Sequence, residues 1–149
     1  MILFVLLVFI DRRGEYCGEK GIWEVETFFK QTIKDPEFAP DAAFLNIIKR
    51  YETIIEEFPN TFAASKAYLS MGRIYLMRKQ YAKAREVLET AVKFSKTQEI
   101  AAYSVAEIGR SYALENNLVM VEKTYVRMLE GYPVTEIGLQ TPFYMVDFL

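Results

Sequence analysis

The chain has 149 residues, 52% of them hydrophobic and 26% charged, which suits one globular domain and excludes a disordered chain. Its net charge of −2 gives no basic excess for binding nucleic acid. It has one cysteine and no histidine, which excludes an internal disulfide, a Ser-His or Cys-His nucleophile and a histidine metal ligand. We therefore expect a binding or structural protein that is not an enzyme and needs no cofactor.

The N-terminal segment, residues 1–21, begins with an apolar run, ILFVLLVFI, at residues 2–10. This run is shorter than the roughly 20 residues of a membrane-spanning helix but matches the apolar core of a secretory signal. Neither a preceding Lys or Arg nor a following small-x-small cleavage site supports a signal. Three interpretations stay open: an export signal or membrane anchor, a buried strand or helix start, and a wrongly chosen start.

Cys17 is a candidate for lipid attachment of the bacterial lipoprotein kind. The residues before it, Gly14, Glu15 and Tyr16, fit that pattern poorly, because small apolar residues are expected there. The alternative is an ordinary free thiol. We divide the chain into this apolar segment with its linker, residues 1–21, and a helical domain, residues 22–149.

The first predicted helix covers residues 41–58, where apolar side chains recur at helical spacing: Phe44, Ile47, Ile48, Tyr51, Ile54, Ile55 and Phe58. Pro59, Asn60 and Thr61 then give a helix stop and a new N-cap. Further helices are predicted over residues 62–78, 81–95, 98–114 and 118–130. No segment alternates convincingly between polar and apolar residues, so the protein is predicted to be all-α. The short connectors at 78–80 and 115–117 require antiparallel helix pairs.

The last predicted helix begins at residue 136. The stretch TEIGLQTPFYMVDFL (135–149) aligns with TFAASKAYLSMGRIY (61–75), and Pro142 is tolerated only near the helix start. We expect the apolar side of this helix, with Phe143, Val146, Phe148 and Leu149, to be partly exposed. Either the natural protein is longer, or this end docks on another chain, which includes a second copy.

An internal repeat appears when the sequence is shifted by 37 residues. AASKAYLSMGRIY (63–75) then falls on IAAYSVAEIGRSY (100–112), so that Gly72 meets Gly109 and Arg73 meets Arg110. A mid-helix glycine costs about 1 kcal/mol relative to alanine. We therefore expect each glycine to mark the closest approach of two helices.

These residues resemble a tetratricopeptide repeat, whose pattern is W-x2-L-G-x2-Y…A-x3-F…P. One copy is Y-x-x-M-G-x-x-Y at 68–75, followed by Ala84, Leu88 and Ala91, and the second is V-x-x-I-G-x-x-Y at 105–112, followed by Val121, Tyr125 and Pro133. The resemblance covers about residues 41–149 and departs at Val121, where alanine is expected. It implies an α-solenoid of antiparallel helix pairs in a right-handed superhelix, with these repeat-packing residues: Gly72, Tyr75, Ala84, Ala91, Gly109 and Tyr112.

The turns FPNT and YPVT resemble those of bacterial envelope repeat proteins, namely the BamD-like outer-membrane assembly lipoproteins and the periplasmic Tol–Pal coordinator. That resemblance implies a protein-interaction scaffold or adaptor in a cell-envelope complex, periplasmic or associated with the outer membrane. The alternative is a cytosolic adaptor or a co-chaperone-like binding module. In either case the expected partner is a protein or peptide, and membrane association would come through the N-terminus.

The first helix of each tetratricopeptide pair lines a concave groove, and the resemblance places eight residues there: Lys66, Leu69, Arg73, Met77, Tyr103, Ala106, Arg110 and Leu114. Arg73 and Arg110 recur once per repeat and could clamp an acidic side chain or a C-terminal carboxylate. The alternative is that both arginines pair with nearby glutamates such as Glu107. The family's carboxylate clamp needs lysine and asparagines at particular groove positions, where this chain has Leu69, Arg73 and Glu107 instead, so recognition of the chaperone C-terminal tail is not expected.

Overall fold

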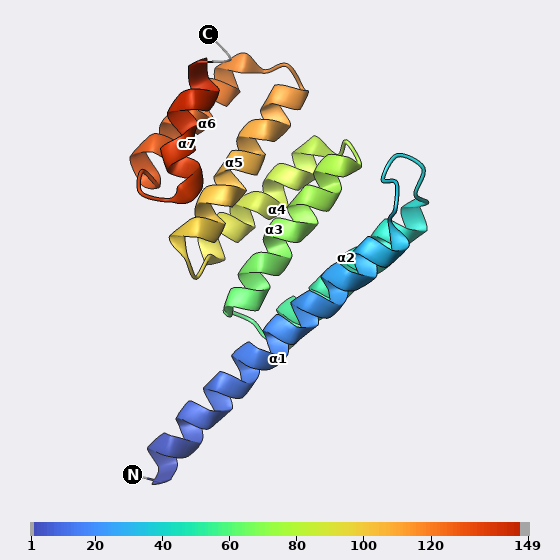
Figure 1. Ribbon diagram of the computed structural model, residues 1–149, viewed down its shortest axis with the longest axis vertical. Coiled ribbons are helices and arrows are strands. Elements are labelled where there is room, and N and C mark those ends of the chain that lie inside the picture. Colours follow the sequence, from blue (N-terminus) through green and yellow to red (C-terminus); the bar gives the residue numbers. More distant parts are fainter. Residues whose placement is uncertain (1, 147–149) are drawn as a thin grey trace. The chain divides into compact units, whose positions relative to one another are not determined.

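The computed structural model describes the backbone of residues 2–146 and the side chains of residues 14–141. This part of the chain contains helices and no strand (Figure 1), which confirms the all-α prediction. The helices are α1 (Ile2–Thr32), α2 (Asp41–Glu57), α3 (Phe62–Met77), α4 (Tyr81–Phe94), α5 (Gln98–Leu114), α6 (Leu118–Gly131) and α7 (Glu136–Val146). The chain forms two compact units, Met1–Ala67 and Tyr68–Leu149. The expectations for the apolar side chains of residues 2–10 and for Phe143, Val146, Phe148 and Leu149 fall outside the described side chains.

In the first unit, α1 and α2 lie side by side and antiparallel (Figure 1). Two glycines of α1 permit this approach. A Cβ atom on Gly21 would lie 3.3 Å from Ile54, and one on Gly18 would lie 3.4 Å from Phe58 and 2.8 Å from Ala63. Helix α1 runs through residue 21 without a break, so the boundary expected there does not coincide with a helix end.

Helix α2 forms because its apolar residues recur every three or four positions, which puts them on one face. Phe44, Ile47, Ile48, Tyr51 and Ile54 are all buried, with exposures of 5% or less. Asp41 in the first turn interacts favourably with the helix dipole. The helix ends one residue before the predicted limit.

In the second unit, α5 packs between α4 and α6 and runs antiparallel to both. The buried residues Ala102, Val105 and Met128 join α5 to α6. Partly buried apolar side chains from α4, α5, α7 and the turn after α6 surround them: Val92, Ala106, Ile137 and Tyr132. Since α5 is antiparallel to both neighbours, α4 and α6 point in the same direction.

A threonine caps the helix that follows each of three turns. The hydroxyl oxygens of Thr61, Thr97 and Thr135 accept hydrogen bonds at 3.1–3.2 Å from backbone N–H groups three residues later. These bonds satisfy donors that a helix N-terminus would otherwise leave unpaired. The predicted cap at Thr61 is therefore confirmed, and two further caps follow the same pattern.

Candidate functional site

The candidate site in the second unit centres on one glutamate shared by two arginines. Arg73 of α3 donates from Nε to Glu107 of α5 at 2.8 Å, and a terminal nitrogen of Arg110 lies 3.4 Å from the other Glu107 carboxylate oxygen. The Glu107 side chain is 12% exposed, whereas those of Arg73 and Arg110 are 42% and 66% exposed. Both arginines therefore contact Glu107, as the alternative interpretation expected, and the cluster keeps a net charge of +1.

Tyr103 links this cluster to α7. Its ring lies 5.9 Å from the Arg73 guanidinium, and its hydroxyl donates to Glu136 at 3.0 Å. The backbone N–H of Glu136 in turn donates to Glu99 at 3.3 Å, so an α5 carboxylate helps to cap α7. The pKa of Tyr103 is raised, chiefly because its hydrogen bond to Glu136 favours the protonated hydroxyl.

The other predicted groove residues lie in different environments. Met77 and Leu114, at equivalent positions near the ends of α3 and α5, are 45% and 52% exposed. Ala106 is half-buried. Lys66 belongs to the first unit, where its Nζ lies 2.9 Å from Glu26 of α1. Leu69 is only 6% exposed and lies in the core, because its position on α3 faces packed side chains rather than solvent.

The repeat-packing residues lie at helix contacts. Gly72 is directly against Leu88, where an added Cβ would be 2.5 Å from Leu88 Cγ. Gly109 faces Thr124 with more room, since a Cβ would lie 3.3 Å from its methyl carbon. The other four are buried or half-buried: Tyr75, Ala84, Ala91 and Tyr112.

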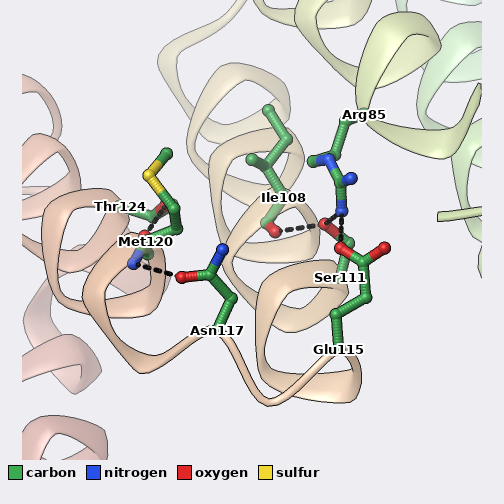
Figure 2. A network of polar contacts seen from close by, with 7 residues as sticks. All are labelled: Arg85, Ile108, Ser111, Glu115, Asn117, Met120 and Thr124. Carbon is green, nitrogen blue, oxygen red and sulfur yellow. Dashed lines mark hydrogen bonds and ion pairs between the residues drawn. The ribbon is translucent and has the colours of Figure 1, made fainter. Parts of the chain in front are cut away.

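Several ion pairs between neighbouring helices were not predicted. Arg127 of α6 binds Glu89 of α4 through two nitrogens, with N–O distances of 2.6 and 2.9 Å. Arg85 of α4 donates to Glu115 and, at 3.1 Å, to Ser111 at the end of α5 (Figure 2). For Glu89 and Arg127, opposite charges about one repeat apart were the available signal, because such residues lie on equivalent helices of successive pairs.

Figure 2 shows how local hydrogen bonds fix the end of α5 and the start of α6. The Ser111 hydroxyl donates to the Ile108 carbonyl at 2.6 Å, which orients its oxygen toward Arg85. The Asn117 side chain accepts from Met120 N–H at 3.3 Å and so caps α6. The Arg85 guanidinium also lies 4.4 Å from the Tyr112 ring, which gives a cation–π contact.

Cys17 is a free, exposed thiol on α1. Its neighbours Glu15 and Tyr16 are also exposed, and burial along the described side chains of α1 begins at Gly18. Among the described residues, we find no helix with the length and apolar character needed to cross a bilayer.

The described residues contain no group of three or more His, Cys, Asp or Glu side chains arranged to hold a metal ion. Comparisons of the chain with protein-family models, with curated proteins and with solved structures gave no match.

Proposed function

We propose that the protein is a protein-interaction scaffold, built as an α-solenoid of tetratricopeptide-like helix pairs. Local features that recur at the 37-residue shift support this proposal. Gly72 lies against Leu88 in one helix pair. In the next pair, Gly109 lies against Thr124 and also approaches Tyr125, the residue that the shift matches with Leu88. Lys79 and Asn116, in the two connectors, have the same left-handed backbone conformation. Catalysis is not part of the proposal, because the chain lacks histidine and Glu107, the acidic residue of the candidate site, is held in ion pairs with Arg73 and Arg110.

The observation that carries the proposal is the arrangement of Arg73, Glu107 and Arg110. Arg110 touches Glu107 through one nitrogen at 3.4 Å, and among the described residues its other donors have no hydrogen-bond partner. Arg73 is held more firmly, at 2.8 Å from Glu107 and near the Tyr103 ring. We therefore assign Arg110 as the guanidinium that binds an acidic side chain or a C-terminal carboxylate of the partner, and Arg73 as its structural support.

Apolar contacts would flank this charged centre. Met77 and Leu114 are exposed at the ends of the same two helices that carry Arg73 and Arg110. Exposed apolar side chains beside a fixed charge are typical of a peptide-binding surface. The proposed ligand is thus a protein segment with an acidic group next to an apolar residue.

Site-specific photo-crosslinking in the native host tests this function. A photoreactive residue at Met77 or Leu114 should crosslink a defined protein, whereas one at Glu86, exposed on α4, should not. Adding Arg110→Glu should abolish the crosslink, and Lys96→Glu, an exposed charge in a turn, should leave it intact. Equal crosslinking by all these variants would contradict the proposed surface.

We also propose that the protein works in the bacterial envelope, attached by lipid at Cys17. Processing before Cys17 is compatible with the packing of α1, because Gly18 and Gly21, which approach Phe58 and Ile54, would remain in the mature chain. Intact-mass measurement on protein from native membrane and soluble fractions tests it. Lipidated protein that begins at Cys17 in the membrane fraction is the expected result. An unmodified thiol in a soluble, full-length protein would support the cytosolic adaptor instead.

A further inference from the structure

The outer face of α6 has an apolar stripe with one charge on each side. Val119 and Val126 are 63% and 41% exposed, and Glu122 and Lys123 are exposed beside them. Together these four residues line a hollow of about 300 Å³ among the described residues. Neither Glu122 nor Lys123 takes part in an ion pair within the described part of the chain.

The face of α4 that the repeat matches with this α6 face is a useful comparison. The 37-residue shift matches Arg85 with Glu122 and Glu89 with Val126. On α4 the residues at these two positions are paired, since Arg85 binds the end of α5 and Glu89 binds Arg127 of α6. Helix α6 points in the same direction as α4. One of these pairs, Glu89 with Arg127, thus joins α4 to a parallel helix, whereas the equivalent α6 face carries valines and has no such partner among the described residues.

The charges on α6 determine which helix orientation this face could accept. Successive helical residues are about 100° apart, so Glu122 and Lys123 lie on opposite sides of the line that joins Val119 and Val126. Two copies of α6 related by a two-fold axis parallel to the helices would bring each valine against its counterpart. In that arrangement Glu122 of each copy faces Lys123 of the other, giving two opposite-charge pairs. An antiparallel arrangement would instead bring glutamate to glutamate and lysine to lysine.

We propose that two copies of this protein associate through parallel α6 helices, with Val119 and Val126 at the centre and two reciprocal Glu122–Lys123 pairs at the sides. The patch is self-complementary, as a two-fold interface requires. It is also small, because it comprises about two helical turns. The association is therefore weak and forms at high local concentration, such as on a shared ligand or surface.

Sedimentation velocity of the full chain from about 10 μM to about 1 mM, a range suited to weak interfaces, tests the proposal. The wild type should show reversible dimerisation. Either single reversal, Glu122→Lys or Lys123→Glu, turns both attractive pairs into repulsive ones and should weaken the dimer by about tenfold. The double swap Glu122→Lys with Lys123→Glu should restore it, and so should an equimolar mixture of the two single variants. Glu86→Lys on the exposed side of α4 is the matched control and should leave the dimer unchanged.

Three results would overturn the proposal. A monomer at every concentration would show that the patch does not self-associate. A dimer that neither single reversal weakens would place the contact elsewhere or make it antiparallel. Failure of the mixed variants to form a heterodimer, with each variant folded by circular dichroism, would show that Glu122 and Lys123 do not face each other.

Discussion

Lys79 and Asn116, 37 positions apart in the sequence, have the same left-handed backbone conformation, with φ of 57° at each. Each follows the first helix of a pair and turns the chain toward the second. The next N–H group then donates to a carbonyl of the preceding helix: Gln80 to Tyr75 and Asn117 to Tyr112, both at 2.9 Å. This is a common helix ending in which glycine is favoured and asparagine is tolerated, whereas lysine is strained.

Replacing Lys79 with glycine should therefore stabilise the protein. We expect Lys79→Gly to raise the free energy of unfolding by about 0.5–1 kcal/mol, because the strain of a left-handed residue exceeds the entropy cost of glycine. Asn116→Gly should gain less, and Lys79→Ala, which keeps a Cβ atom, should gain nothing. Urea unfolding of the three variants measures the order. A loss of stability in Lys79→Gly larger than in Lys79→Ala would contradict the strain argument.

The two repeat glycines should respond differently to alanine. Gly72→Ala forces a Cβ atom into Leu88 and should destabilise by about 1–3 kcal/mol, the usual cost of overpacking. Gly109→Ala would place a Cβ atom 3.3 Å from the Thr124 methyl carbon, a tight contact that a small shift of the Thr124 side chain relieves. Its gain in helix propensity of about 1 kcal/mol should offset that adjustment. Thermal and urea unfolding test this pair. If Gly109→Ala proved the more damaging change, the assigned closest approach would be wrong.

Gly138 should tolerate alanine least. A Cβ atom there would overlap the Tyr132 carbonyl oxygen and lie 2.9 Å from the Thr135 hydroxyl. Backbone cannot move aside as the Leu88 side chain can, so Gly138→Ala should disrupt the capped turn at Thr135 and loosen α7. Hydrogen exchange should show the lost protection in residues 136–141 first, with α4 and α5 protected as before. Full retention of α7 protection would refute the steric argument.

The Arg127–Glu89 pair should show measurable coupling despite its exposure. Its two parallel hydrogen bonds give it the favourable bidentate geometry, but side chains 41% and 50% exposed are partly screened by water. A double-mutant cycle with Arg127→Ala and Glu89→Ala should give about 0.5–1 kcal/mol, reduced in about 1 M salt. The Lys20–Glu24 pair, more exposed and 3.6 Å apart, is the comparison and should give less. Equal coupling in both pairs would remove any special role for the bidentate contact.

Sequence patterns were sufficient to locate six of the helices. For α2 to α6 the apolar period of three to four residues and the turn residues agree, with the predicted cap at Thr61 marking the start of α3, and the predicted limits differ from the observed ones by one residue at most. The start of α7 followed from the alignment of Thr135 with Thr61. Helix α1 was not predicted as one element, because three glycines and an abrupt change from apolar to charged residues obscure its period. Two of those glycines, Gly18 and Gly21, are where α1 approaches α2 and the start of α3.

The candidate site was less predictable than the fold. The repeat placed Arg73 and Arg110 at equivalent positions, but their shared partner depends on how α3 and α5 pack. Position alone also put Leu69 in the groove, although the structure buries it. A family pattern predicts which side of a helix a residue lies on. Whether its side chain is exposed there depends on the neighbouring side chains, which differ from one chain to another.

The placement of Glu107 makes the charge of this face unusually easy to alter. One carboxylate compensates two guanidinium groups from adjacent helices, so a single substitution at residue 107 would change the local charge from +1 to +2 and release both arginines together. Replacing either arginine would instead leave a neutral pair. Residue 107 is thus the position at which evolution or an engineer could strengthen or retune anion binding in one step, without touching the residues that make the contact.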